Sequence, residues 1–173
     1  MAALSGEDSL KVIVFADSHG SSEEMELVLR LEKPEVCLHL GNDAEDILGL
    51  RRAFPETRFD AVRGNGDSSG AQEELFTVLG KMRVLMTHGH RYGVKQTLLR
   101  AEYAARERGA DILLFGHTHA PLLTYSGTLT LMNPGTVSGV YSGLFTYGLI
   151  DIGDGARCFI ENVSKARVQK RGL

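Results

Sequence analysis

The sequence predicts an α/β protein, in which short buried strands alternate with helices. Short, continuous apolar runs recur along the chain, which is typical of strands that are buried on both faces. Apolar residues at helical spacing follow several of these runs. A composition of 43% hydrophobic and 24% charged residues is that of a globular chain, and 173 residues suffice for one sizeable core. We therefore expect a single domain over residues 1–173.

The amino-terminal part of the chain begins with the apolar run 11–16, which is expected to be the first strand. Residues 21–24 then read S-x-x-E, the pattern of a capping box, and Met25, Val28 and Leu29 follow at helical spacing. A helix is therefore expected after the first strand. The other elements expected in this part are a strand at 35–40, a helix at 47–54 that Pro55 ends, and a strand at 59–62.

The middle of the chain is expected to hold an antiparallel pair of strands, 75–79 and 82–87, joined by a turn at Gly80-Lys81. A helix that carries apolar residues from Val94 to Ala105 on one face and ends at Gly109 should follow. The later elements expected are strands at 112–114, 122–125, 128–132, 144–152 and 156–163, a turn at 133–136 and a frayed basic tail at 165–171. The segment 140–147 is expected to lie in the core, with a dimer surface as the alternative.

The net charge of −3 argues against general binding of nucleic acids or anionic membranes, because such binding needs a basic surface. No apolar run approaches the ~18 residues of a membrane span, and residues 1–8 do not resemble a signal peptide. A cytoplasmic protein is therefore expected. Cys37 and Cys158 form no C-x-x-C pair, and Cys37 is expected to be a buried thiol.

Side chains of the kinds that commonly bind metals follow several of the apolar runs. They are Asp17 and His19, Asn42 and Asp43, Asn65, His88, and His117 and His119. Two divalent cations ~3.5–4 Å apart need such a set of N and O ligands, converging from several loops with positions left open for substrate. Mixed imidazole and carboxylate ligands suit Mn, Fe, Zn, Ni or Co better than Ca or Mg. Each motif alone is also compatible with a turn or with solvated histidines.

The ordered motifs together resemble the calcineurin-like metallophosphoesterases, and more narrowly the small bacterial and archaeal phosphodiesterases of the YfcE type. The motifs are D-S-H-G at 17–20, L-G-N-D at 40–43, R-G-N-G-D at 63–67, T-H-G-H at 87–90, G-H-T-H-A-P at 116–121 and N-P-G-T at 133–136. The resemblance extends from about Lys11 to the last expected strand. The order and spacing of all the motifs are specific, whereas no single motif is.

This resemblance implies a four-layer α/β/β/α sandwich of two mixed sheets. It also implies a centre of two divalent metal ions, with manganese as the first expectation and nickel, zinc, iron or cobalt as alternatives. A first ligand set of Asp17, His19 and His119 and a second ligand set of Asn65, His88 and His117 would hold them. A hydroxide between the metals would attack the phosphorus of a small phosphodiester in line.

One departure from the family pattern concerns the residue that bridges the two metals. The family has aspartate at this place, and the natural alignment puts Asn42 there. The amide NH2 group cannot ligate a metal, and the negative charge is lost. We expect Asn42 in the bridging position with reduced metal affinity; the alternatives are that Asp43 replaces the carboxylate, or that an original aspartate was changed to asparagine.

A second departure concerns the acid that protonates the leaving group. Larger family members carry a histidine after the asparagine of the motif, and here that residue is Gly66. Substrates with good leaving groups should then be preferred. Besides Asn65, the residues expected to take part in catalysis are Asp67 and His90. A turn aspartate and a histidine that only supports the ligands are the alternative interpretations.

Two functions follow from these residues. The first is a metal-dependent phosphodiesterase that hydrolyses small phosphodiesters, with some activity on phosphomonoesters. The second is a non-catalytic scaffold with a weakened metal site, because a fold alone does not determine a function. The four motif histidines, His19, His88, His117 and His119, favour the enzyme, and Asn42 favours the scaffold. A homo-oligomer is left open.

Overall fold

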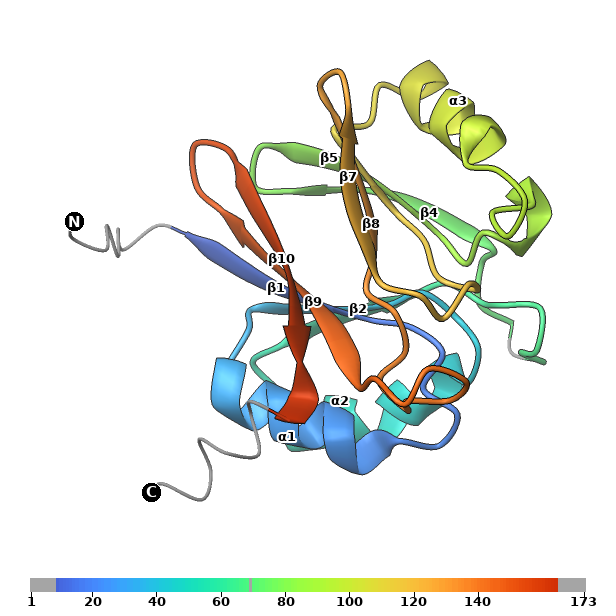
Figure 1. Cartoon of the computed structure of the whole chain (residues 1–173). Helices are drawn as coiled ribbons and strands as arrows, with labels where there is room; N and C mark the ends of the chain where they lie inside the picture. The colour runs from blue at the N-terminus through green and yellow to red at the C-terminus, as the bar shows by residue number, and fades with distance from the viewer. Residues whose placement is uncertain (1–8, 69, 165–173) are drawn as a thin grey trace.

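The structure is a computed structural model that describes residues 9–68 and 70–164. Its strands form two five-stranded sheets with the orders β10-β9-β1-β2-β3 and β4-β5-β6-β8-β7 (Figure 1). The strands of the first sheet are β1 (Leu10–Phe15), β2 (Val36–His39), β3 (Arg58–Ala61), β9 (Thr146–Ile152) and β10 (Ala156–Asn162). Those of the second are β4 (Glu74–Leu79), β5 (Met82–Thr87), β6 (Ile112–Leu114), β7 (Leu122–Ser126) and β8 (Leu129–Asn133).

Both sheets are mixed, and each contains three adjacent strands that run in parallel. Strand β1 pairs in parallel with β2, and β2 with β3, while β9 and β10 join on the other side in antiparallel fashion. In the second sheet β5, β6 and β8 are parallel, and β4 and β7 are antiparallel edges. The loops that leave the carboxyl ends of parallel neighbours lie at one edge of a sheet, which is where α/β proteins bind ligands.

Helices cover the outer face of each sheet (Figure 1). Helices α1 (Ser22–Glu32) and α2 (Ile47–Ala53) lie against the first sheet, and α3 (Leu99–Glu107) lies against the second. Short 3₁₀ turns occupy Ala44–Asp46, directly before α2, and His90–Tyr92. The resulting order of helix, sheet, sheet and helix confirms the expected four-layer sandwich.

The alternation of side chains along β1 explains why its sequence is a continuous apolar run. Val12 and Val14 face the second sheet and pack with residues such as Val84 and Met86 of β5. The intervening residues of β1 face the opposite way, toward buried residues of α1 and α2. A strand buried on both faces has no solvent face and therefore no polar alternation. A third cluster packs Ala101 and Ala105 of α3 on the outer face of the second sheet.

The helix boundaries differ from the sequence prediction in two places. Ser21 is the residue before α1, but its side chain makes no capping hydrogen bond, so the predicted capping box is wrong. Helix α3 begins at Leu99, because the residues after Gly93 form turns closed by Gln96 N–H and Thr97 N–H on the Gly93 carbonyl. Val94 is nevertheless buried in the same cluster as α3.

The segment 140–147 is core only at its end. Tyr147 of β9 is buried, as expected, whereas Tyr141 is 92% exposed and Leu144 is 48% exposed. The expectation of a core segment is therefore wrong for residues 141 and 144. Cys37 and Cys158 are both buried free thiols. No helix in the described ranges is long and apolar enough to cross a membrane. The basic tail at 165–171 lies outside the described residues.

Candidate metal centre

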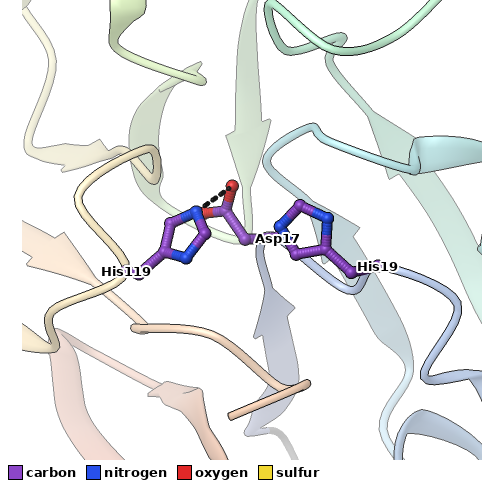
Figure 2. Close-up of side chains that lie close together, drawn as sticks. All are labelled: Asp17, His19 and His119. Atoms are coloured by element: carbon purple, nitrogen blue, oxygen red, sulfur yellow. Dashed lines mark ion pairs between the residues drawn. The ribbon is translucent and has the colours of Figure 1, made fainter. Parts of the chain in front are cut away.

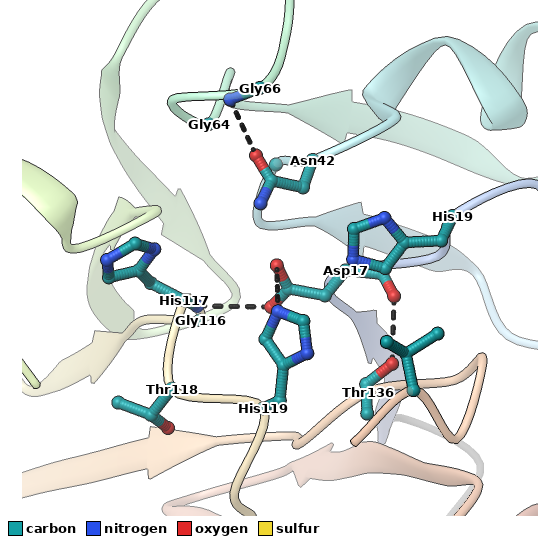
Figure 3. A network of polar contacts seen from close by, with 12 residues as sticks. Asp17, His19, Asn42, Gly64, Gly66, Gly116, His117, Thr118, His119 and Thr136 are labelled. Atoms are coloured by element: carbon teal, nitrogen blue, oxygen red, sulfur yellow. Dashed lines mark hydrogen bonds and ion pairs between the residues drawn. The ribbon is translucent and has the colours of Figure 1, made fainter.

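Loops at the carboxyl ends of strands from both sheets bring the predicted ligands together (Figure 3). Asp17 and His19 follow β1, and Asn42 follows β2. From the second sheet, His88 follows β5, and the loop after β6 carries His117 and His119. Residues separated by about a hundred positions are in contact here: the backbone N–H of His117 donates to Asp17 Oδ2 at 3.1 Å.

The first ligand set, Asp17, His19 and His119, forms the tightest group. One potential ligand atom from each residue lies within 4.8 Å of the others (Figure 2). Asp17 is fully buried, and its Oδ1 accepts no hydrogen bond in the described part of the chain. This oxygen lies 3.2 Å from His119 Nε2 and 3.9 Å from His88 Nε2. One oxygen of Asp17 therefore faces a histidine of each ligand set.

Burial makes the Asp17 carboxylate costly when it is ionised. Removal from water raises the pKa of Asp17 to about 6, and the backbone N–H of His117, the neighbouring His19 and the Asn42 side chain only partly oppose this effect. A buried acceptor without a donor destabilises the fold unless something charged or polar satisfies it. A divalent cation beside Oδ1 would do so.

Hydrogen bonds determine which ring nitrogens of the second ligand set carry the protons. His88 Nδ1 donates to the carbonyl oxygen of Leu40 at 2.8 Å, so its Nε2 keeps a lone pair. His117 Nδ1 lies 3.2 Å from that Nε2 and donates to it. Burial lowers the pKa of His88 to about 3 and that of His117 to about 4. Both rings are therefore neutral at pH 7, the form in which imidazole binds metals.

His19 and His119 are also oriented by their surroundings. His19 Nδ1 lies 3.2 Å from Asp43 Oδ2, an arrangement in which a carboxylate holds the Nδ1 proton and leaves Nε2 available. Asp43 therefore contacts His19 from outside the ligand group, and the structure does not place it between the two sets. His119 Nδ1 is buried without a hydrogen-bond partner in the described ranges.

Asn42 lies between Asp17 and the glycine loop after β3, and its bridging of two metals stays a prediction. Its Oδ1 accepts the backbone N–H of Gly66 at 3.0 Å (Figure 3). Gly64 must be glycine, because a Cβ atom there would overlap Asn42 Oδ1. With Oδ1 committed to Gly66, the NH2 group is the part of Asn42 that interacts with Asp17. An NH2 group offers no lone pair to a cation.

Asp67 has a structural part in this region. Its carboxylate accepts the backbone N–H groups of Asn42, Asp43, Ala44 and Gly64, at 2.9, 2.6, 3.3 and 2.7 Å. These bonds fasten the loop after β2 to the loop after β3. Both oxygens of this carboxylate therefore act as hydrogen-bond acceptors. These contacts are those of a turn aspartate, and a role of Asp67 in catalysis stays a prediction.

Asn65 and His90 lie at the edge of the group. Asn65 is exposed on the turn between Gly64 and Gly66. The ring of His90 has its centroid 5.5 Å from that of His88 and 6.2 Å from that of His117. His90 Nδ1 is buried and has no hydrogen-bond partner in the described part of the chain. The roles of Asn65 and His90 in the reaction stay predictions.

The backbone of the site is strained, which the sequence does not show. Left-handed φ angles of non-glycine residues cost free energy and concentrate at functional sites. Eight non-glycine residues of the described chain have such angles, and six of them belong to the loops of this site: Asp17, His19, Asn42, Asp43, His117 and His119, at 51°, 44°, 58°, 65°, 69° and 58°. Tight packing of the surrounding loops must hold this conformation.

Several residues that support the site were not singled out from the sequence. His39 is fully buried; its Nδ1 accepts the Gly41 N–H at 3.1 Å and its Nε2 lies 2.9 Å from Ser18 Oγ, which donates to Asp46 Oδ2. Burial lowers the pKa of His39 to about 4, so the ring is a neutral link between the loops after β1 and β2. A histidine inside the expected strand 35–40 was the one available signal.

The N-P-G-T turn supports the loop that carries His117 and His119. Asn133 Nδ2 donates to the carbonyl of Gly116 and to Thr118 Oγ1, at 3.0 and 2.8 Å. Thr136 Oγ1 donates to the carbonyl of Asp17 at 2.8 Å. The turn therefore connects the β6 loop and the β1 loop, and Asn133 has a structural role in it.

Comparison with known proteins agrees with this geometry. Residues 10–155 match the calcineurin-like phosphoesterase superfamily domain. The probable metallophosphoesterase YsnB of Bacillus subtilis is 37% identical over 131 residues, which are 74% of this chain and 75% of the relative. The phosphodiesterase YfcE of Escherichia coli K12 is 31% identical, with 82% of this chain and 88% of the relative covered.

A solved structure of similar shape comes from Streptococcus pneumoniae, where the protein is described as a predicted phosphoesterase. It superposes with a TM-score of 0.74 at 27% identity and covers 92% of both chains. The overall fold agrees with this solved structure. The chain belongs to the calcineurin-like phosphoesterase superfamily, and it is a metal-dependent phosphoesterase.

Proposed function

We propose that this chain hydrolyses small phosphodiesters at a centre of two divalent cations that it holds with unequal strength. The observation that carries the proposal is the convergence of a buried carboxylate, one oxygen of which accepts no hydrogen bond, and four imidazoles from loops of both sheets. Family membership supports the phosphoesterase chemistry. The relative YfcE, named as a phosphodiesterase, supports diesters as the substrate class.

The first ligand set would hold the tighter ion, through Asp17, His19 and His119. The second ligand set, Asn65, His88 and His117, would hold the weaker one, because it contributes no negative charge of its own and Asn42 adds none. Divalent cations supply two things to this reaction: they neutralise charge on the phosphoryl oxygens and they acidify water. Imidazole and carboxylate together suit manganese, which we propose as the working ion, and also nickel, zinc, iron or cobalt.

Lys95 adds a positive charge to the approach of the substrate. It is exposed, and no hydrogen bond or ion pair involves it within the described residues. Its charge nevertheless lowers the pKa of Asp17, of His117 and of His119, so it acts on both ligand sets. A cation at this place would attract the phosphate anion of the substrate.

His90 is the residue we propose for proton transfer to the leaving group. Asp67 is occupied by backbone donors, and Gly66 has no side chain. If His90 has this role, its replacement by Gln should slow diesters of poorly acidic alcohols much more than diesters of p-nitrophenol, because good leaving groups need no proton. An equal loss on both kinds of ester would assign His90 to supporting the neighbouring histidines instead.

The alternative function is a scaffold with a weakened metal site, and Asn42 is the feature that favours it. The presence of all four motif histidines, His19, His88, His117 and His119, around the Asp17 carboxylate favours the enzyme. Strained backbone at six residues of the site points the same way, because a scaffold has no need to maintain such strain.

Hydrolysis of bis(p-nitrophenyl) phosphate with and without Mn²⁺ tests the proposal. The parent chain should show metal-dependent turnover, His117→Ala should lose it, and Asn42→Asp should raise it at low metal concentration. Asp154→Asn, on the exposed loop between β9 and β10, is the matched surface control and should behave as the parent does. Absence of turnover in the parent and in Asn42→Asp with every candidate metal would favour the scaffold.

A further inference from the structure

Tyr141 is an exposed aromatic residue beside the first ligand set. Its ring centroid lies 5.2 Å from the ring centroid of His119, and the residue is 92% exposed. Most of the ring therefore faces solvent while its edge adjoins the site. In the described ranges no hydrogen bond involves its hydroxyl group. An aromatic ring in such a place contributes little to the stability of the fold, because it buries almost no area.

The backbone at Tyr141 is held in an unfavourable conformation. Its φ angle is 69°, and apart from Lys33 it is the one left-handed non-glycine residue in the described ranges outside the metal-site loops. Gly139 and Gly143 flank it with φ angles of 70° and 66°, and the Gly143 N–H donates to the Gly139 carbonyl at 2.8 Å. This closed turn projects a bulky side chain at an energetic cost, which is typical of a functional position.

The base of this turn is fastened to the metal site itself. Ser138 Oγ donates to the carbonyl of Asp17 at 3.1 Å, and Thr136 Oγ1 donates to the same oxygen. A Cβ atom on Gly139 would come within 2.7 Å of the Phe145 ring, so the turn is packed closely at its foot. The backbone of Tyr141 is therefore held at a fixed place relative to Asp17 and His119, while most of its ring is exposed to solvent.

We propose that Tyr141 is a substrate-contacting residue that stacks on a planar ester group of the phosphodiester, so that the chain prefers diesters of aromatic alcohols or nucleosides over alkyl diesters. The inference rests on the proposed function of the same site. A phosphate placed at the first ligand set has its ester groups within reach of a residue that touches His119. A flat ring gains from stacking on an exposed tyrosine face, whereas a methyl group gains little.

Binding of phosphonates tests this inference without turnover, because a P–C bond is not hydrolysed. Calorimetry with Mn²⁺ present should show that the parent binds phenylphosphonate about tenfold more tightly than methylphosphonate. Tyr141→Phe should keep this preference, and Tyr141→Ala should reduce it to about twofold or less. Tyr103→Ala, which removes another exposed tyrosine, on α3, is the matched control and should keep it. Metal stoichiometry measured in Tyr141→Ala shows whether His119 was disturbed.

A kinetic experiment shows whether the group that stacks on Tyr141 is a simple aryl group or a nucleoside. Methyl, phenyl and thymidine 5′ esters of p-nitrophenyl phosphate share one leaving group, so their relative kcat/KM values report recognition of the second ester. A Tyr141-dependent gain for phenyl alone indicates simple aryl esters, and a gain for thymidine indicates nucleotides.

Three results overturn the stacking proposal: the parent binds both phosphonates equally, it binds neither, or Tyr141→Ala keeps the preference with normal metal content. A Tyr141-dependent preference in a chain that hydrolyses no diester would instead overturn the proposed function and leave the stacking site standing.

Discussion

The two ligand sets of the metal site differ in charge, although their imidazoles are alike. The first set combines His19 and His119 with the buried carboxylate of Asp17. The second set offers the neutral rings of His88 and His117 and the neutral amide of Asn65, and the neighbouring Asn42 is uncharged as well. With similar imidazole ligands in both sets, the carboxylate should make the first set the tighter one for a divalent cation.

In the metal-free protein the first ligand set should lower the stability of the fold more than the second set does. The first set holds a carboxylate that burial destabilises in its ionised form. The second set holds neutral rings that satisfy one another, since His117 Nδ1 donates to His88 Nε2. An ion at the first set would relieve an unsatisfied charge, whereas an ion at the second set must break a hydrogen bond. Occupation of the first set should therefore come first.

Asp17→Asn should break the comparison most completely, because it removes the one carboxylate from the two ligand sets. We expect metal binding and turnover to fall below detection. Thermal unfolding with and without Mn²⁺ should show a metal-dependent shift in the parent and none in the variant. Asp154→Asn should keep the parent's shift. A retained shift in Asp17→Asn would show that the carboxylate is not what holds the first ion.

Asp17→Asn should also change how the stability of the metal-free protein depends on pH. The pKa of Asp17 is raised from 3.8 to about 6, so between these values the folded chain keeps a proton that the unfolded chain releases. The folded state therefore loses stability as the pH rises through this range, by up to about 3 kcal/mol. At pH 7 metal-free Asp17→Asn should be more stable than the parent, and the two should converge near pH 4. Denaturant unfolding at each pH measures this difference.

Single histidine variants sharpen the comparison by separating the two sets. His119→Ala should lose the tightly bound ion, with a decrease in affinity of at least about a hundredfold. His117→Ala should keep that ion and lose turnover. Calorimetric titration with Mn²⁺ measures both affinities. Equal effects of the two variants on the tight ion would contradict the assignment of these histidines to different ions.

Asp67→Asn should loosen the frame of the second set and leave the first set intact. The variant replaces a carboxylate that accepts four backbone N–H groups with an amide that can accept fewer, and we expect a loss of about 2 kcal/mol in the free energy of unfolding. Because these donors lie in the loops after β2 and β3, affinity for the first ion should hardly change. If activity disappeared while stability stayed at the parent's value, Asp67 would be a catalytic residue after all.

Lys95→Gln should have the smallest effect, because the side chain is exposed and its charge is screened by solvent. The expected result is a rise in KM of about threefold to tenfold with little change in kcat and none in metal stoichiometry. The difference from the parent should shrink at high salt. A salt-independent loss in kcat would place Lys95 in contact with the reacting groups.

Much of the fold follows from local patterns in the sequence. The continuous apolar run of β1 predicts burial on both faces, and Val12 and Ile13 do pack toward opposite layers. The grouping of Asp17, His19 and His119 is also predictable, because these residues stand in loops that follow such runs. The start of α3 at Leu99 was missed, since glycine turns before it override the helical spacing that begins at Val94.

The finer properties of the site depend on contacts between distant loops and could not be predicted. The N–H of Gly66 determines the orientation of the Asn42 amide. Asp67 accepts N–H groups from a different loop, and these contacts determine its structural role. The left-handed backbone at residues such as His117 requires support from neighbouring loops. No pattern within a few residues carries this information, because the energies arise only once both sheets are packed together.

The count of tightly bound ions in the parent and in Asn42→Asp tests the inequality of the two ligand sets most directly. After dialysis against metal-free buffer, elemental analysis should find one ion per parent chain and two per Asn42→Asp chain. Calorimetry should show the second ion bound about ten to a hundred times more tightly in the variant. Two ions retained with similar affinity in the parent, or no change in Asn42→Asp, would contradict the account.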